Sequence, residues 1–396
     1  MRLKMFHIEL KSKPKWFYLA VGCLAISSTP SFADNTETTM KGGGIQFKQG
    51  NVSFKIGGRI EFDHDHFNGV HKTDDVGRGT EVRRGRLYVK STLNKEWEGK
   101  LQIEVNDKTQ DALFQDIYVK YKGWKGVDLT IGKAKEPFGL EVLQSSRYLT
   151  FVERAMISDA FGPLRSYGLK LFGQRGKVTV ASGIYTEEQD EGHPETYAWS
   201  NRVTFAPVIT NDAIVHFGLA GSYRDLGGKN YQIKKTAEVH LADKIIKSRI
   251  TAADHVILLG AEAAVTLGPF SLQTEYMRAD VDAASDSGIQ DANYDGYYVQ
   301  ASYFLTGEMY SYKKGRFGTF KQHSAQNVWQ LTSRFSHIDV KDYQIGVEAD
   351  NITLGVNYYP NSQIHFFLNY IMTNLTGAVP NEEDGKALSL SFLYIF

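Results

Sequence analysis

Apolar and polar residues alternate along most of the chain that follows residue 33. In the stretch "VSFKIGGRIEFDHDH", Phe54, Ile56, Ile60 and Phe62 fall on one face of a strand, and charged side chains fall on the other. The same period of two recurs in "WEGKLQIEVND", "LFQDIYVKY" and "SQIHFFLNYIM". A sustained helical period is almost absent from this part of the chain. The pattern therefore predicts an all-β protein.

The lengths and connections of these strands indicate a membrane barrel rather than a soluble sandwich. The strands are about ten residues long, and their second face is charged. Short turns at "NKEWEG", "KGWKG", "GQRG", "APVITND", "LGPF" and "YPNS" alternate with long loops at residues 67–80, 135–166 and 282–295. The chain has 23 Phe and 22 Tyr residues, and they gather at strand ends, where a membrane interface favours aromatic rings. One rim of short turns and one rim of long loops is the layout of an outer-membrane barrel.

The number of strands follows from the alternation and from the need for closure. A first count gives seventeen strands, whereas a bacterial barrel needs an even number. Residues 227–254, which include "KKTAEVHLADKII", break the alternation of loop lengths, so we assign them to an external loop. The prediction is a closed antiparallel transmembrane β-barrel of sixteen strands over residues 52–396, with an aqueous lumen.

The chain ends on a strand whose apolar face is intact to the last residue. This face, read in steps of two, contains Leu388, Leu390, Phe392, Tyr394 and Phe396. Leu393 and Ile395 are also apolar, although the alternation places them on the opposite face. An open strand edge in hydrocarbon would leave backbone groups unpaired, so we expect this strand to close the barrel against the first one.

The first 33 residues have the features of a secretory signal peptide. A basic flank precedes the apolar run of residues 16–26, and "SFA" supplies small residues for cleavage after Ala33. The run is too short to cross a bilayer as a helix. Two alternatives stay open: an uncleaved anchor or buried helix, and a lipoprotein acylated at Cys23. We expect export to the outer membrane of a Gram-negative-type bacterium, with residues 34–51 as a short periplasmic segment.

Composition argues against several classes of function. The whole chain carries 45 basic and 45 acidic residues, and the predicted cleavage, which removes five basic residues and one acidic residue, leaves 40 and 44. A mildly acidic chain is not typical of a nucleic-acid-binding protein. The single cysteine, Cys23, lies in the signal peptide, so we expect no disulfide and no Cys-based metal site. We also expect no enzyme activity, cofactor or metal, because the histidines of "HDHFNGVH" mark a strand end and a nucleophile elbow is missing.

The strand alternation predicts which charged side chains face the lumen. In "TEVRRGRLYVKSTL" it places Arg84 and Arg86 inward and Arg83 toward lipid. The same parity places four more arginines inward, namely Arg59, Arg202, Arg224 and Arg334. Arginine keeps its charge and donates paired hydrogen bonds to phosphate oxygens, so these residues predict an anion path. The alternative is that they pair with lumenal acids, such as Glu61 and Glu262, and only stiffen the wall.

Residues 135–166 form the longest early loop, and they are too apolar to extend into water. We expect this loop to fold into the barrel and to narrow it, as functional long loops often do. It carries Arg147, Arg154 and Arg165. The alternative is that the loop only packs against the barrel wall.

Several stretches resemble the phosphate-selective porin O and P family. They are "KIGGRIEFDHDHF", "EVRRGRLYVKSTLNKEW", "KEPFGLEVLQSSRYLTFVERA", "AFGPLRSYGLKL", "NVWQLTSRFSHIDV" and "NITLGVNYYPNSQIHFFLNY", and they span most of the chain in the order of the family. The resemblance implies a sixteen-stranded outer-membrane barrel, usually a trimer, with an inward constriction loop. It also implies an anion site made by the neighbouring pair Arg83 and Arg84 and by Arg147, where lysine is common in the family. A β-bulge or an early strand end is needed for Arg83 to reach the lumen together with Arg84.

These observations together predict an anion-preferring diffusion channel for phosphate or polyphosphate. The expected partners are small anions, membrane lipid and two further copies of the chain, but not nucleic acid. Two alternatives stay open: a general or cation-preferring porin without a phosphate site, and a non-conducting structural or adhesin barrel.

Overall fold

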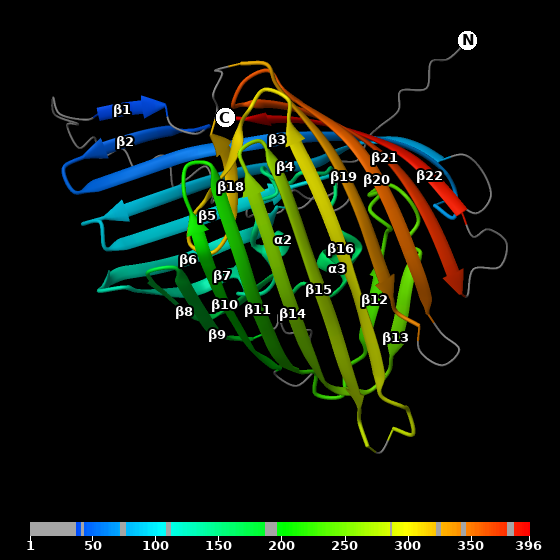
Figure 1. Cartoon of the computed structure of the whole chain (residues 1–396). Helices are drawn as coiled ribbons and strands as arrows, with labels where there is room; N and C mark the ends of the chain where they lie inside the picture. The colour runs from blue at the N-terminus through cyan, green and yellow to red at the C-terminus, as the bar shows by residue number, and fades with distance from the viewer. Residues whose placement is uncertain are drawn as a thin grey trace, which may run out of the picture.

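The computed structural model describes residues 37–40, 43–71, 77–107, 112–186, 196–285, 287–321, 326–341, 346–377 and 384–396. The predicted signal peptide lies outside these residues. Within them, sixteen antiparallel strands form one closed barrel (Figure 1), which confirms the predicted fold class. The barrel strands are β3 (Val52–Gly69), β4 (Gly77–Leu93), β5 (Trp97–Val105), β6 (Leu113–Trp124), β7 (Val127–Lys135), β8 (Arg165–Arg175), β9 (Val178–Thr186), β10 (Tyr197–Ile209), β11 (Ala213–Asp225), β14 (Ala253–Leu267), β15 (Phe270–Ala283), β16 (Ala292–Phe304), β19 (Val328–Asp339), β20 (Val347–Tyr359), β21 (Ile364–Gly377) and β22 (Asp384–Ile395).

The terminal strand closes the barrel. β22 pairs with β3 in antiparallel register, with Phe392 opposite Phe62. Beyond this ladder, the backbone N–H of Gly58 donates to the carbonyl oxygen of Phe396 at 2.6 Å, and the Phe396 N–H donates to the Gly58 carbonyl oxygen at 3.1 Å. The prediction that the last strand pairs with the first barrel strand is therefore confirmed. Closure satisfies the backbone groups that an open edge would leave unpaired in lipid.

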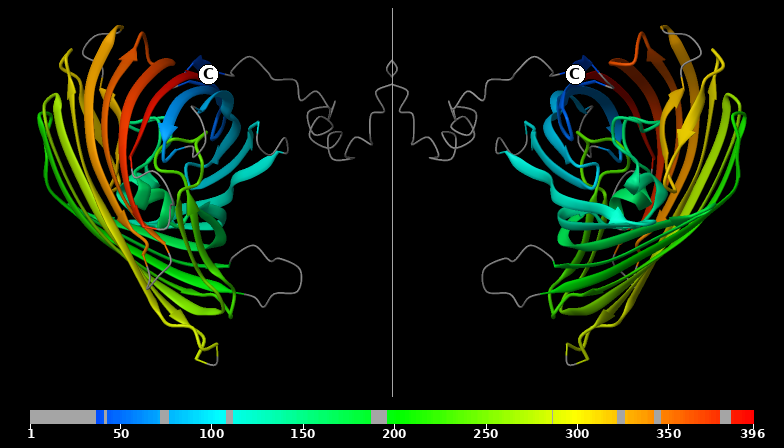
Figure 2. Two further views of the ribbon diagram at one scale, coloured as in Figure 1. Left: turned by 90° about the vertical axis from the view of Figure 1, so that its right-hand side faces the viewer. Right: turned by 90° about the vertical axis from the view of Figure 1, so that its left-hand side faces the viewer.

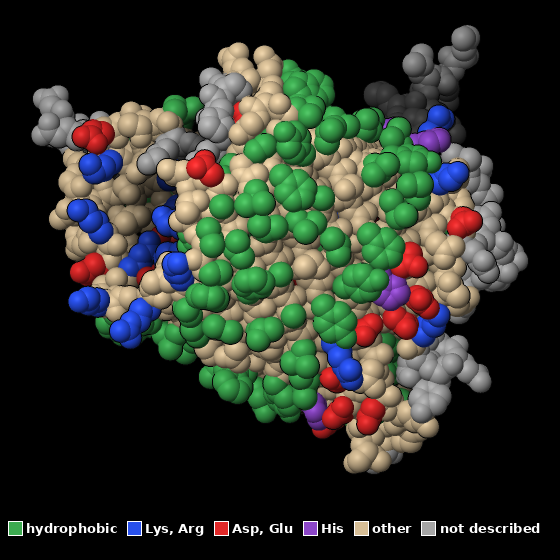
Figure 3. Space-filling model, in the orientation of Figure 1, with side chains coloured by type: hydrophobic (Ala, Val, Ile, Leu, Met, Phe, Trp, Pro, Cys, Tyr) green, Lys and Arg blue, Asp and Glu red, His purple; other side chains and the backbone are tan. Residues whose placement is uncertain are grey.

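The outer wall of the barrel is apolar between charged rims. Figure 3 shows hydrophobic side chains over a broad band of the wall, with charged side chains gathered toward its edges. On the terminal strand, Leu388, Leu390 and Tyr394 point outward and keep 39%, 44% and 40% of their surface accessible. Leu393 and Ile395 are buried inside the barrel, at 2% and 3%. Their environment inside the lumen must therefore be apolar.

Two further strands extend the wall near the chain ends. β1 (Glu37–Met40) pairs with β2 (Ile45–Gln49). β2 in turn pairs with residues 52–56 of β3, which lie beyond the part of β3 that β22 reaches. Residues 34–51, predicted to be a short periplasmic segment, thus contain a two-stranded ribbon attached to the sheet.

The loop between β7 and β8 folds into the barrel, as predicted. It contains the short helices α2 (Leu140–Leu143) and α3 (Met156–Ala160), which Figure 2 shows inside the barrel. We call residues 136–164 the constriction loop. No helix among the described residues is long and apolar enough to cross a membrane.

A second loop also folds inward, which corrects the assignment of residues 227–254 to an external loop. Within it, β12 (Tyr231–Lys235) pairs with β13 (Ile246–Ile250). Ile233 and Ile246 are 2% and 0% exposed, and they join α3 in an apolar core inside the barrel. The apolar side chains of this segment are more stable in that core than in water, so the segment does not stay outside.

A third segment enters the lumen from the rim of short turns, which the sequence pattern did not indicate. β17 (Met309–Tyr312) and β18 (Phe317–Lys321) form a hairpin between β16 and β19. We call residues 309–321 the inner hairpin. Tyr310 and Phe317 are buried together with Leu393 and Ile395 in a second apolar core. This core explains the inward apolar residues of the terminal strand.

Candidate functional site

Two buried carboxylates fix the constriction loop against one side of the barrel wall. Glu275 on β15 accepts hydrogen bonds from the backbone N–H groups of Leu140 and Glu141, at 2.6 and 2.7 Å. Glu136, which is fully buried at the start of the loop, accepts a hydrogen bond from Arg224 on β11 at 2.9 Å. The opposite side of the loop faces the strands from β3 to β8 across a cavity.

A β-bulge brings both members of the predicted basic pair into the lumen. Glu61 lies opposite Arg84 and Phe62 lies opposite Val82, so Arg83 is the extra residue of β4. Strict alternation would have directed Arg83 toward lipid. The bulge supplies the change of register that turns it inward, where it reaches the acids described next.

The carboxylate of Glu153, in the constriction loop, lies against this basic pair. Its Oε1 atom is 2.6 Å from Arg83 Nε and 3.6 Å from Arg84 Nη2. Arg84 also binds Glu61 at 2.5 Å. Burial disfavours the ionised form of Glu153, but the two guanidinium groups outweigh burial and hold the pKa of its carboxyl well below its ordinary value. The pair is therefore engaged by the protein's own acids.

Three other predicted lumenal arginines are paired with acids in the same way. Arg202 binds Glu262, Arg224 binds Glu136, and Arg334 binds Glu238. All three arginines face the lumen, but they do not line the large basic cavity that the described residues enclose. Their arrangement fits the alternative in which lumenal arginines and acids stiffen the wall.

A cavity of about 420 Å³ lies between the strands from β3 to β8, the constriction loop and the inner hairpin. Two acidic side chains, Asp116 and Asp159, line it, against ten basic ones. The basic residues are Arg59, Arg86, Lys100, Lys120, Lys135, Arg147, Arg154, Arg165, Lys170 and Arg316. The structure thus brings three of the eight predicted site residues, Arg59, Arg86 and Arg147, to one cavity.

Four of the ten basic groups in the cavity lie near acids. Arg86 binds Glu104, Lys100 and Arg165 share Asp116, and Arg59 Nε lies 3.9 Å from Glu61 Oε2. The remaining six form no ion pair within 4 Å of a described acidic residue; they are Lys120, Lys135, Arg147, Arg154, Lys170 and Arg316. The cavity therefore carries a large excess of positive charge.

Five of these six basic groups contact neutral parts of the protein, namely Lys120, Lys135, Arg147, Arg154 and Lys170. The guanidinium of Arg147 lies over the rings of Tyr88 and Tyr148, 5.5 and 5.8 Å from their centroids. Lys170 Nζ donates to the carbonyl oxygen of Lys135 at 2.6 Å. Neutral partners orient a cation without cancelling its charge, so the field in the cavity is left to attract anions.

Burial and crowding destabilise the charged forms of some of the cavity cations. Loss of hydration lowers the pKa of Arg154 in the constriction loop and of Arg316 in the inner hairpin, and nearby acidic groups offset this effect only in part. Arginine nevertheless stays protonated near neutral pH, because its ordinary pKa is above 12. An anion that enters the cavity would therefore stabilise the positive charges of Arg154 and Arg316.

Seven of the ten cavity cations were absent from the eight predicted site residues, although Arg154 and Arg165 had been noted as part of the long loop. Lys170 lies between Leu169 and Leu171, which point outward at 52% and 47% exposure, so strand parity alone could have placed it inside. Lys100 and Lys120 also lie on polar strand faces. Lys135 and Arg316 gave no such signal, because their positions depend on the constriction loop and the inner hairpin.

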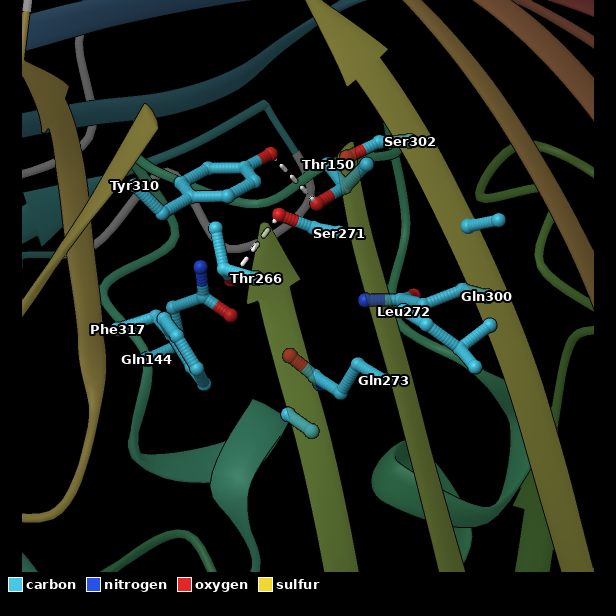
Figure 4. A pocket seen from close by; sticks show the side chains of 12 residues that line it. Gln144, Thr150, Thr266, Ser271, Leu272, Gln273, Gln300, Ser302, Tyr310 and Phe317 are labelled. Carbon is cyan, nitrogen blue, oxygen red and sulfur yellow. Dashed lines mark hydrogen bonds between the residues drawn. The ribbon is translucent and has the colours of Figure 1, made fainter. Parts of the chain in front are cut away.

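A second, much smaller cavity lies where the constriction loop meets the inner hairpin (Figure 4). Its volume is about 20 Å³, enough for a single water molecule, and its lining is neutral. Thr150 and Tyr310 form a hydrogen bond at its edge. This cavity is a contact between two inserted segments rather than a site for a substrate.

Histidines and acids do not assemble into a metal site in the described part of the chain. In the stretch "HDHFNGVH", His64 Nδ1 lies 2.7 Å from Thr80 Oγ1, and His71 is buried beside Thr373, 3.0 Å away.

Known proteins resemble this chain in sequence or in fold. Porin O of Pseudomonas aeruginosa is 24% identical over 426 aligned residues, which cover 96% of this chain and 97% of that protein. The anion-selective porin from Comamonas acidovorans has a similar fold, with a TM-score of 0.57, 13% identity, and coverage of 87% of this chain and 100% of that one. The trimer form of OmpT from Vibrio cholerae has a TM-score of 0.56 at 13% identity, with coverage of 88% and 100%. The family model of phosphate-selective porin O and P matches residues 54–396, and the chain therefore belongs to this porin family.

Proposed function

We propose that this protein is an outer-membrane channel for diffusion of anions, with phosphate or polyphosphate as its preferred substrate. The observation that carries the proposal is the basic cavity, in which ten cations face two acids. Phosphate oxygens accept hydrogen bonds from guanidinium and ammonium groups, and rings of basic residues select anions in pores. The same proposal includes export by the predicted signal peptide. It also includes the role of a porin rather than of an enzyme.

Arg147 is the residue that we expect to contact the anion most directly. Its charge is held over two aromatic rings and is not ion-paired with a described acid. Arg59 and Arg86 lie close by, because both donate to Ser146 Oγ, at 2.6 and 3.2 Å. A site in a pore must also release its ligand, so we expect millimolar affinity, about 4 kcal/mol.

The test is the chloride current of the purified barrel in a planar bilayer, titrated with phosphate. We expect an anion-selective reversal potential in a salt gradient and a phosphate block that falls about tenfold in Arg147→Ala, a loss of about 1.4 kcal/mol. Arg278→Ala is the matched control, because Arg278 is exposed and binds Asp280. A cation-selective reversal potential, or an unchanged block in Arg147→Ala, would reject the proposal.

One observation favours a general porin as the second candidate. Arg83, Arg84, Arg202, Arg224 and Arg334 are all ion-paired, so they add little net charge to the lumen. A general porin would conduct without phosphate block. A non-conducting barrel would show no current in the same experiment.

We also propose that the protein is a homotrimer. The support is the similarity to a porin whose structure is described as a trimer form. The mass of the detergent-solubilised, unheated protein tests this proposal, and a mass of one chain would contradict it.

A further inference from the structure

A short segment of the second inward loop runs along the inside of the barrel wall from β20 to β3. We call residues 237–243 the lumen strap. At one end, Asn351 on β20 donates its side-chain amide to the carbonyl oxygen of Ala237 at 3.1 Å. At the other end, the N–H of Leu241 donates to Asp65 on β3 at 3.1 Å, and the N–H of Asp243 donates to the carbonyl oxygen of His71 at 3.0 Å. The strap thus joins two parts of the wall that are far apart in sequence.

The strap covers carboxylates that belong to the barrel wall. Asp65 and Glu81 are 1% and 6% exposed, and each is contacted by a strap residue: Leu241 binds Asp65, and His240 binds Glu81. Asp63, the next inward residue of β3, is 1% exposed. These acids lie on β3 and β4, the strands that also carry Arg59 and Arg86 of the basic cavity, and all three are buried in the structure.

Glu238 holds the strap in place. Its carboxylate binds Arg334 on β19, accepts a hydrogen bond from Thr353 on β20 at 3.3 Å, and accepts another from the backbone N–H of Met156 at 3.2 Å. Its backbone has a φ of 64°, a left-handed conformation that is unusual for a residue with a side chain. Such a conformation persists where surrounding contacts impose it. Here these contacts link the strap to the barrel wall and to the constriction loop.

We propose that the lumen strap sets the ion selectivity of the channel by covering the acids of β3 and β4, and that Glu238 is the positioning residue that keeps the strap closed. The inference rests on the proposed anion channel. An open strap would expose Asp65 and Glu81 to the aqueous path, where they attract cations. A closed strap leaves the basic cavity as the route for ions.

The substitution Glu238→Ala separates this role from a simple change of charge. Removing one negative charge, with Arg334 left unpaired, should raise the preference for anions if the strap stays closed. If the strap opens, the anion-to-cation permeability ratio falls at least about twofold and the conductance rises. We expect the fall. Glu96→Ala is the control, because Glu96 is exposed in a short turn and should change neither quantity.

A second readout reports the strap directly. Ala237 is 0% exposed, and the only natural cysteine, Cys23, lies in the predicted signal peptide. The thiol introduced by Ala237→Cys should be unreactive toward a charged, membrane-impermeant thiol reagent, and it should become reactive when Glu238→Ala is added. If Glu238→Ala does not assemble, Glu238→Gln keeps the volume and loses the ion pair, and the same two measurements apply.

The outcomes distinguish the strap from the proposed function. A wild-type channel that prefers anions, combined with variants in which selectivity is unchanged or increased and the thiol at position 237 stays unreactive, overturns the strap and leaves the anion channel standing. A wild-type channel that does not prefer anions rejects the proposed function itself.

Discussion

Thr150 Oγ1 in the constriction loop lies 3.1 Å from the hydroxyl of Tyr310 in the inner hairpin (Figure 4). The two segments enter the barrel from opposite rims and meet inside it. The Tyr310 hydroxyl also accepts a hydrogen bond from Gln330 on β19 at 2.6 Å. This contact connects the constriction loop to the rim of short turns through one buried hydroxyl group.

Tyr310→Phe should destabilise the contact between the two inserted segments. The substitution keeps the ring but leaves Thr150 and Gln330 with one partner fewer in a buried site, which costs about 1–3 kcal/mol. A folded barrel migrates differently from the unfolded chain on a gel when the sample is not heated. We expect the urea concentration at which half of this folded band is lost to be lower for the variant than for wild type. Tyr303→Phe is the control, because Tyr303 points outward at 46% exposure. Equal midpoints for Tyr310→Phe and wild type would show that the hydroxyl contributes nothing to stability.

Asp116→Asn should strengthen phosphate block. Asp116 lies 2.5 Å from Lys100 and 2.6 Å from Arg165, so it neutralises part of the basic cavity. Removing one negative charge a few ångströms from a bound anion gains more than 1 kcal/mol at an effective dielectric constant of about 20, so we expect block about tenfold tighter.

Asp159→Asn is the matched control for this prediction. Asp159 lines the same cavity, but its side chain is 48% exposed and binds Lys235 at 3.5 Å. Solvent screens its charge, so its removal should change the block much less. A larger effect of Asp159→Asn than of Asp116→Asn would place the anion elsewhere in the cavity.

Arg84 and Glu61 should behave as a structural ion pair. Their side chains are 4% and 6% exposed and lie 2.5 Å apart. Arg84→Leu leaves Glu61 with weaker compensation, which costs about 3–5 kcal/mol for a broken buried pair. The double variant Arg84→Leu/Glu61→Leu should recover most of this loss. Urea unfolding of the purified barrels measures both quantities, and a fully stable Arg84→Leu barrel would contradict the assignment.

Phe396→Asp should impair assembly of the barrel. The Phe396 ring lies 5.8 Å from that of Tyr394 and packs beside Gly58, where the last and first barrel strands meet. A charged side chain where the first and last barrel strands meet weakens closure. The amount of folded barrel seen on a gel of unheated samples should therefore decrease. Phe396→Leu keeps an apolar side chain and should assemble better. A Phe396→Asp barrel at wild-type levels would argue against a role for the terminal ring.

The sequence by itself determined the barrel and the direction of most side chains. Because side chains alternate between the two faces of a strand, the sequence indicates the face that each residue occupies. Because antiparallel membrane strands must close into a barrel, the number of strands must be even. For this reason the sixteen strands, the closing contact of β22 and the inward direction of Arg59, Arg86 and Arg334 could all be predicted. Leu393 and Ile395 looked misplaced only because the pattern says nothing of what fills the lumen.

Only the tertiary structure decided which inward residues meet. Strand parity treats Arg86 and Arg202 alike, yet Arg86 lines the basic cavity and Arg202 is paired with Glu262 away from it. The difference arises because three segments fold into the lumen and choose which part of the wall they cover. Their positions depend on contacts between residues that are far apart in sequence, such as Glu238 with Arg334 and Arg202 with the carbonyl oxygen of Gly315. Local periodicity carries no information about such contacts, because it records the environment of each residue along a strand and not its partner across the barrel.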